Sequence, residues 1–156
     1  MCARDPFTAI SSIMRENSDA VISLEFRRKH ILKEFNVDIL LIESPFQQAI
    51  ASYYYWSKIA LEKSNPEVVI RIEDDEETLY DHLSSYGYDI QFTKDLLPPK
   101  NINANKKWKG QVTPKPAING SEWLMLNNKY KLMINELCDE FGYDLVFDKS
   151  LKKLLR

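Results

Sequence analysis

A cation and a hydroxyl flank the start of a predicted helix near the amino end of the chain. Arg4 directly precedes Asp5 and Pro6, and Ser12 follows the arginine at a spacing of eight residues. Asp5 suits the N-cap because its carboxylate can accept from the first free backbone N–H groups. Pro6 suits the first helical position because its missing N–H would have no partner there. We therefore expect a helix that begins at Pro6.

The helical period predicts which of these side chains point outward. Thr8 and Ser12 fall roughly opposite an apolar face made by Phe7, Ile10, Ile13 and Met14. A cation, an outward hydroxyl and the positive end of a helix together favour an anion site. The alternative is an ordinary capped helix with a surface arginine.

The run Arg4-Asp5-Pro6 with Ser12 resembles the motif with which sulfotransferases of the P-loop-like superfamily hold the 3′-phosphate of 3′-phosphoadenosine 5′-phosphosulfate (PAPS). Further stretches keep that family's order along the chain. They are an aromatic helix at Tyr53–Glu62, a strand with an Arg-x-Glu-Asp ending at Val69–Asp74, an asparagine-bearing loop at Lys100–Asn103, and a closing region with Trp123 and Phe141–Tyr143.

The resemblance implies an α/β, helix-rich fold of the P-loop-like three-layer type, with a short, mainly parallel sheet flanked by helices. It implies transfer of a sulfuryl group from PAPS, as co-substrate and without a metal, to an unidentified acceptor hydroxyl. The residues that match the family's nucleotide-binding positions are Arg4, Ser12, Asn103 and Lys106.

The family's Gly/Ser/Thr-rich loop for the 5′-phosphosulfate has no counterpart. None of the 4 glycines forms a G-x-x-x-x-G-K pattern. We therefore interpret the chain as the C-terminal part of a sulfotransferase fold, inactive when isolated, with a partner chain as a possible source of the rest. The alternative is a noncatalytic α/β fragment that acts as an interaction or nucleotide-binding module.

The other elements follow from periodicity and punctuation. We expect Met1–Ala3 to pair in parallel with an interior strand ending at Ile72, and Val37–Ile42 fits either a strand or a helix. Helices are expected from Pro6, Ile22 and Pro45, at Glu76–Tyr86 and at Asn128–Phe141, with a short helical turn at Thr93–Leu97. A break is expected at Glu16–Asp19, where Ser18 or Asp19 could cap the next helix. A long loop is expected at about 98–120.

No convincing catalytic base accompanies these elements. Glu73 could lie at the carboxyl end of the predicted strand, where open α/β sheets bind ligands. His30 lies in a basic cluster, and His82 follows Asp81 within a predicted helix. For both histidines a surface or packing role is the better interpretation, so no catalytic residue is assigned.

Composition is that of an ordinary single domain of 156 residues. A formal charge of −2 gives no support to nucleic-acid binding. The spacing of Cys2 and Cys138 fits reduced thiols and no zinc site. The sequence contains neither a membrane span nor a secretory signal, so we expect a cytoplasmic protein.

Overall fold

The computed structural model describes residues 1–73, 76–87 and 116–147. The chain divides into two compact units, one formed by Met1–Ile72 with Lys115–Arg156, the other by Glu73–Pro114. Within the second unit, α4 (Glu76–Ser85) is followed by Gly87, whose backbone has a positive φ of 82°. The predicted turn at Thr93–Leu97 and residues 98–115 of the predicted long loop lie outside the described residues.

The first two helices are joined almost directly. α1 (Pro6–Asp19) begins as predicted, with Asp5 as its N-cap and Pro6 in its first turn. α2 (Val21–Phe35) follows after Ala20 alone, which has an extended φ of −129° and supplies no side-chain cap. The predicted break at Glu16–Asp19 is therefore wrong, because α1 continues through those polar residues and the chain turns at Ala20.

The ambiguous apolar segment after α2 forms η1 (Ile39–Leu41), a single 3₁₀ turn. The Asp38 carboxylate fixes this turn by accepting from the Leu40 amide at 3.0 Å and from Arg28 Nε and Nη2 at 2.7 and 2.6 Å. α3 (Pro45–Ser64) then begins at the expected Ser44 cap and ends before Asn65, which adopts the left-handed conformation.

The two strands are short and parallel. β1 (Cys2–Ala3) pairs with β2 (Ile70–Arg71), in a register that sets Cys2 opposite Ile70 and Ala3 opposite Arg71. The Ile70 and Ile72 amides donate to the carbonyls of Met1 and Ala3, both at 2.8 Å. The predicted pairing of these segments is confirmed.

The predicted fold class is wrong. Two strands of two residues each are the only strands among the described residues, and helices form most of the rest. Ile72, expected in an interior strand, is 62% exposed. A short apolar run does not distinguish an interior strand from an extended segment packed on one side only. The apolar surface of the chain is buried among helices instead of on a mainly parallel sheet.

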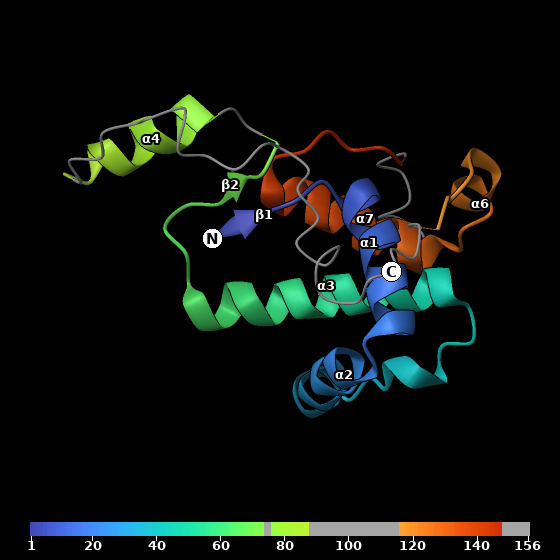
Figure 1. Ribbon diagram of the computed structural model, residues 1–156. Coiled ribbons are helices and arrows are strands. Elements are labelled where there is room, and N and C mark those ends of the chain that lie inside the picture. Colours follow the sequence, from blue (N-terminus) through green and yellow to red (C-terminus); the bar gives the residue numbers. More distant parts are fainter. Residues whose placement is uncertain (74–75, 88–115, 148–156) are drawn as a thin grey trace. The chain divides into compact units, whose positions relative to one another are not determined.

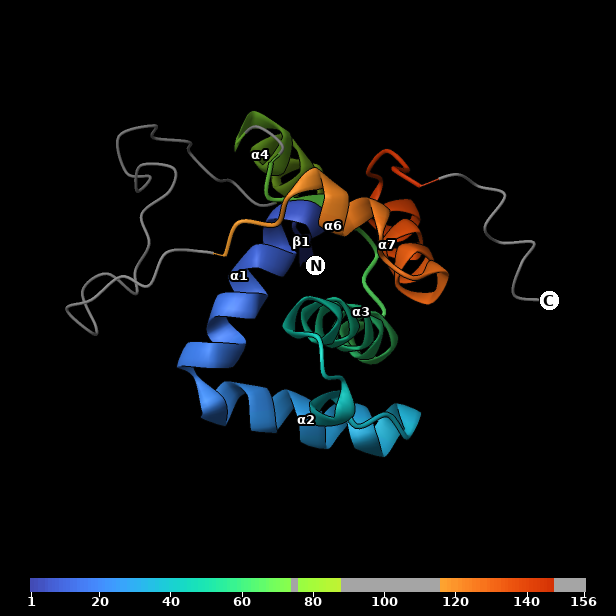
Figure 2. The ribbon, with the colours of Figure 1, turned by 90° about the vertical axis from the view of Figure 1, so that its right-hand side faces the viewer.

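In the first unit, α1, α2 and α7 (Asn128–Phe141) pack against α3 (Figures 1 and 2). α7 begins at the Asn127 cap and ends as predicted at Gly142, whose φ is 72°. A short helix, α6 (Gly120–Leu124), precedes it behind a capping box of Asn119 and Glu122.

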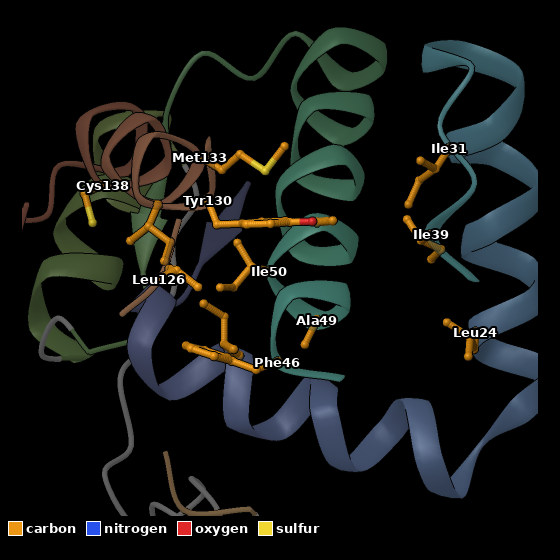
Figure 3. Packing of buried hydrophobic residues seen from close by; sticks show 13 residues of the cluster. Leu24, Ile31, Ile39, Phe46, Ala49, Ile50, Leu126, Tyr130, Met133 and Cys138 are labelled. Atoms are coloured by element: carbon orange, nitrogen blue, oxygen red, sulfur yellow. The ribbon is translucent and has the colours of Figure 1, made fainter. Parts of the chain in front are cut away.

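The core has two sides, one on each flank of α3. Figure 3 shows Ile50, Phe46 and Met133 between α3 and the helices α1 and α7, and Ile31 and Ile39 between α3 and α2. A smaller cluster of Ala3, Leu137 and Phe141 joins β1 to α7. The strand pair is therefore positioned by helices, and it holds Arg4 at the entry to α1.

Candidate functional site

Arg4 lies between the end of β1 and the start of α1. Its carbonyl oxygen accepts a 2.7 Å hydrogen bond from the Tyr53 hydroxyl of α3, so its backbone is fixed from two directions. The side chain is half-buried, and its guanidinium forms no ion pair or hydrogen bond with any described residue. A fixed backbone with an available guanidinium is a suitable arrangement for an anion.

Asp5 occupies backbone amides at the start of α1 that were expected to help bind an anion. Its carboxylate oxygens accept from the backbone amides of Phe7 and Thr8, each at 3.2 Å. These are the donors that a ligand anion at the helix terminus would use. The expected role of the helix N-terminus as part of the anion site is therefore wrong for these two donors, and the Asp5 charge opposes an anion bound nearby.

Ser12 lies two helical turns beyond this entry. Its hydroxyl donates to the Thr8 carbonyl at 3.3 Å, a local bond that an external acceptor could replace. Pro6 to Ser12 rises roughly 9 Å along the helix, and Arg4 lies two residues before it, so an anion can touch both Ser12 and Arg4 only if the arginine reaches along the helix over Thr8. The spacing permits a shared ligand only with the arginine side chain extended.

Arg15 was not among the predicted site residues. It is half-buried and follows Ser12 by three residues, a spacing that sets the two side chains on neighbouring positions of one helical face. Asn103 and Lys106, the other predicted nucleotide-binding residues, lie outside the described residues.

A concave region, which sequence reasoning missed, lies away from Arg4 among α2, α3 and α7. It is an open groove of about 440 Å³. Its lining combines aromatic and charged side chains, among them Phe35, Tyr54, Tyr55, Lys58, Lys129 and Glu136. The Phe35 and Tyr55 ring centroids are 4.9 Å apart, and those of Tyr54 and Tyr55 are 5.1 Å apart in an edge-to-face arrangement.

Several polar side chains of this groove form hydrogen bonds and ion pairs with one another. Tyr54 donates its hydroxyl proton to Glu136 Oε2 at 2.5 Å, and Lys58 pairs with Glu140 and, at 3.8 Å, with Glu136. Burial, and then the hydrogen bond to Glu136, raises the pKa of Tyr54 above its ordinary value. A raised pKa keeps the phenol protonated at neutral pH, so Tyr54 is not suited to act as a general base, and its hydrogen bond to Glu136 joins α3 to α7.

The two histidines, His30 and His82, both pack against aromatic rings. The His30 ring lies 4.6 Å from that of Phe26 and 6.0 Å from that of Trp56. In the second unit, the ring centroids of His82 and Tyr86 are 5.1 Å apart, and the buried Nε2 of His82 forms no hydrogen bond with a described residue. Glu73 is exposed. These positions provide no base aimed at Arg4 within the first unit, and the catalytic residue stays unassigned.

The described residues contain no group of three or more His, Cys, Asp or Glu side chains that could hold a metal ion. None of the described helices combines the length and the apolar character needed to cross a membrane. Comparisons with protein-family models, with curated proteins and with solved structures gave no match.

Proposed function

We propose that this chain holds the 3′-phosphate end of PAPS for a sulfotransferase-type reaction, with Arg4 as its main ligand and Ser12 as a second donor. The observation that carries the proposal is the contact between segments whose order along the chain resembles that family. Tyr53 of the aromatic helix bonds the Arg4 carbonyl at 2.7 Å. β2, which bears the Arg-x-Glu-Asp ending, pairs with β1 directly before Arg4.

The closing segment joins the same group of elements. Arg71 Nη1 donates to the Gly142 carbonyl at 2.8 Å, and its guanidinium lies 5.5 Å from the Tyr143 ring centroid. Their order along the chain does not by itself bring these stretches together, whereas the stretches within the described residues contact one another. Their contacts support a common role in fixing the backbone around Arg4.

The Arg4 guanidinium would bind the terminal phosphate through charge-assisted hydrogen bonds. Ser12 would donate its hydroxyl after giving up the bond to Thr8. Asp5 would reduce the net attraction, because its carboxylate lies at the same helix terminus. PAPS itself supplies the sulfuryl group, and a hydroxyl compound is the expected acceptor.

The sequence offers no loop for the 5′-phosphosulfate, so the proposal includes a further segment or partner chain that provides it. Asn103 and Lys106 stay predicted ligands of the nucleotide. Without the loop, the chain would act as a noncatalytic nucleotide-binding module. The cytoplasm is the compartment predicted from the sequence for either role.

Calorimetric titration tests the proposal with adenosine 3′,5′-bisphosphate and, as its matched ligand, adenosine 5′-phosphate. We expect the bisphosphate to bind more tightly, and Arg4→Ala to weaken it by roughly 10- to 100-fold, the loss for a charged hydrogen bond of about 1.5–3 kcal/mol. Lys33→Ala removes an exposed cation from α2 and should leave binding unchanged. Equal affinity for the two nucleotides, or full binding by Arg4→Ala, would refute the site.

A further inference from the structure

α2 carries apolar residues on two faces. Leu24 and Ile31 point into the core, at 8% and 0% exposure. On the rest of its surface Ile22 is 89% exposed, Phe26 is 55% exposed and Leu32 is 40% exposed. A helix with one apolar stripe is complete when that stripe is buried, whereas further exposed apolar residues on another face offer a surface to a second partner.

The outward residues follow a heptad spacing. Ile22, Glu25, Lys29 and Leu32 are separated by three, four and three residues, and all four are exposed. This is the spacing of a seam between two packed helices. Figure 2 shows α2 along the lower edge of the view, with α3 on its inner side and no described element on its outer side.

The charges of Glu25 and Lys29 favour a second copy of α2 as the partner and an antiparallel orientation of the two helices. If the seam meets an identical seam in antiparallel orientation about a two-fold axis, Ile22 packs on Leu32 of the other copy and Glu25 faces Lys29. Each of these contacts then occurs twice. In a parallel pair, Glu25 would face Glu25 and Lys29 would face Lys29, and such like-charge contacts are destabilising.

We propose that two copies of this chain associate through an isologous, antiparallel contact of their α2 helices, with Ile22, Glu25, Lys29 and Leu32 as the seam. Glu25 also accepts from Arg28 Nη1 at 3.3 Å within its own helix, and this exposed bond leaves its second oxygen for the partner's ammonium. Phe26 borders the seam near the two-fold axis, where it meets its own equivalent. The contact is independent of the proposed nucleotide site, because none of its residues belongs to that site.

The expected association is weak. α2 has 15 residues and a length of about 22 Å, so the paired helices form an interface at the small end of specific protein contacts. Sedimentation equilibrium should therefore be measured over roughly 10 µM to 1 mM, where micromolar to millimolar dissociation constants are resolved. We expect a monomer–dimer equilibrium, and a monomer at every concentration would overturn the proposal.

Charge reversal tests the pairing itself. Glu25→Lys and Lys29→Glu each bring like charges together twice, and each should weaken self-association by roughly tenfold or more. An equimolar mixture of these two variants should form a heterodimer, because every charge then faces its opposite. The double variant Glu25→Lys/Lys29→Glu should associate as the original chain does. Absence of dimer in both the mixture and the double variant would overturn the charge pairing.

Two controls are needed. The first tests whether the position of the charge matters and not the net charge alone, and the second distinguishes an antiparallel from a parallel helix pair. Glu34→Lys makes the same change of charge on α2 but away from the seam, and it should leave association unchanged; circular dichroism verifies the fold of every variant. In a Cys2→Ser background, Ile22→Cys mixed with Leu32→Cys should give a mixed disulfide upon oxidation. Preferential Ile22→Cys homodimers would instead indicate a parallel pair and would refute the proposed orientation.

Discussion

Arg27 joins three helices through its guanidinium, and its removal is the most informative perturbation of the fold. It donates to Glu16 Oε1 at 2.8 Å and Asn17 Oδ1 at 2.7 Å on α1, and to Ser52 Oγ at 3.1 Å on α3. A further bond reaches Ser23 Oγ at 3.2 Å within α2. Arg27→Met keeps an unbranched apolar stem and removes all four hydrogen bonds.

The expected loss of stability depends on which acceptors of the Arg27 hydrogen bonds are too buried to bind water instead. Ser52 is fully buried and Asn17 is 9% exposed, so each would lose a donor that water cannot easily replace. Such a loss costs about 1–3 kcal/mol per group. The Glu16 side chain is 43% exposed and can be hydrated. We therefore expect Arg27→Met to lower the free energy of unfolding by about 2–5 kcal/mol.

Urea denaturation followed by circular dichroism measures this loss, and the neighbouring arginine provides the control. Arg28 also pairs with carboxylates, Asp38 and Glu25, but its side chain is 33% exposed against 11% for that of Arg27. Arg28→Met should therefore destabilise the chain clearly less than Arg27→Met. Equal losses for the two variants, or a loss below about 1 kcal/mol for Arg27→Met, would refute the assignment of Arg27 as a buried connection.

The same network predicts a pH dependence. Burial acts to raise the pKa of Glu16, but hydrogen bonds from Ser23 and Arg27 outweigh it, so the pKa is lower than in the unfolded chain. A lowered pKa contributes stability that is present above the unfolded value of about 4.3 and is lost as the pH falls through the folded value. The free energy of unfolding should therefore depend less on pH in this acidic range for Glu16→Gln than for the original chain.

Three further outcomes are expected. Cys138 is 1% exposed, and burial, followed by the charge of Asp5, raises the pKa of its thiol to about 11. In a Cys2→Ser background, a thiol reagent at pH 8 should therefore react fast with Cys138 only after denaturation. Rapid reaction of the folded chain would contradict this expectation. Ile134→Ala creates a cavity in the core and should cost about 2–5 kcal/mol by urea denaturation, and a cost below 1 kcal/mol would contradict its burial. The purified chain should show no turnover of radiolabelled PAPS above a heat-killed control, because the sequence has no loop for the reacting group, and measurable turnover would overturn that expectation.

Local signals predicted the helix boundaries well. Asp5 with Pro6, Ser44 with Pro45, and Gly142 each act through one or two neighbouring backbone groups, so the sequence nearby suffices to identify them. Ala20 offers no such signal, and the joint between α1 and α2 was accordingly misplaced. The fold class required knowledge of how many strands pair, which the short segment 68–72, with four apolar residues, cannot provide.

The candidate site could be predicted only in part for the same reason. Arg4 and Ser12 belong to one short stretch, whereas the groove depends on Tyr54 and Glu136, which are 82 residues apart. The hydrogen bond from Tyr54 to Glu136 of α7 could not be foreseen across that distance in sequence. The competition from Asp5 could have been inferred from the sequence, because a carboxylate cap occupies the donors that an anion would need.

Nuclear magnetic resonance offers the most direct test of the proposed phosphate site. Arginine Nε–H signals and backbone amides can be followed during titration of the ¹⁵N-labelled chain with adenosine 3′,5′-bisphosphate. The account predicts saturable shifts at the Arg4 Nε–H and the Ser12 amide that are much weaker with adenosine 5′-phosphate. Unchanged Arg4 and Ser12 signals, or shifts confined to the groove around Lys58 and Lys129, would contradict it.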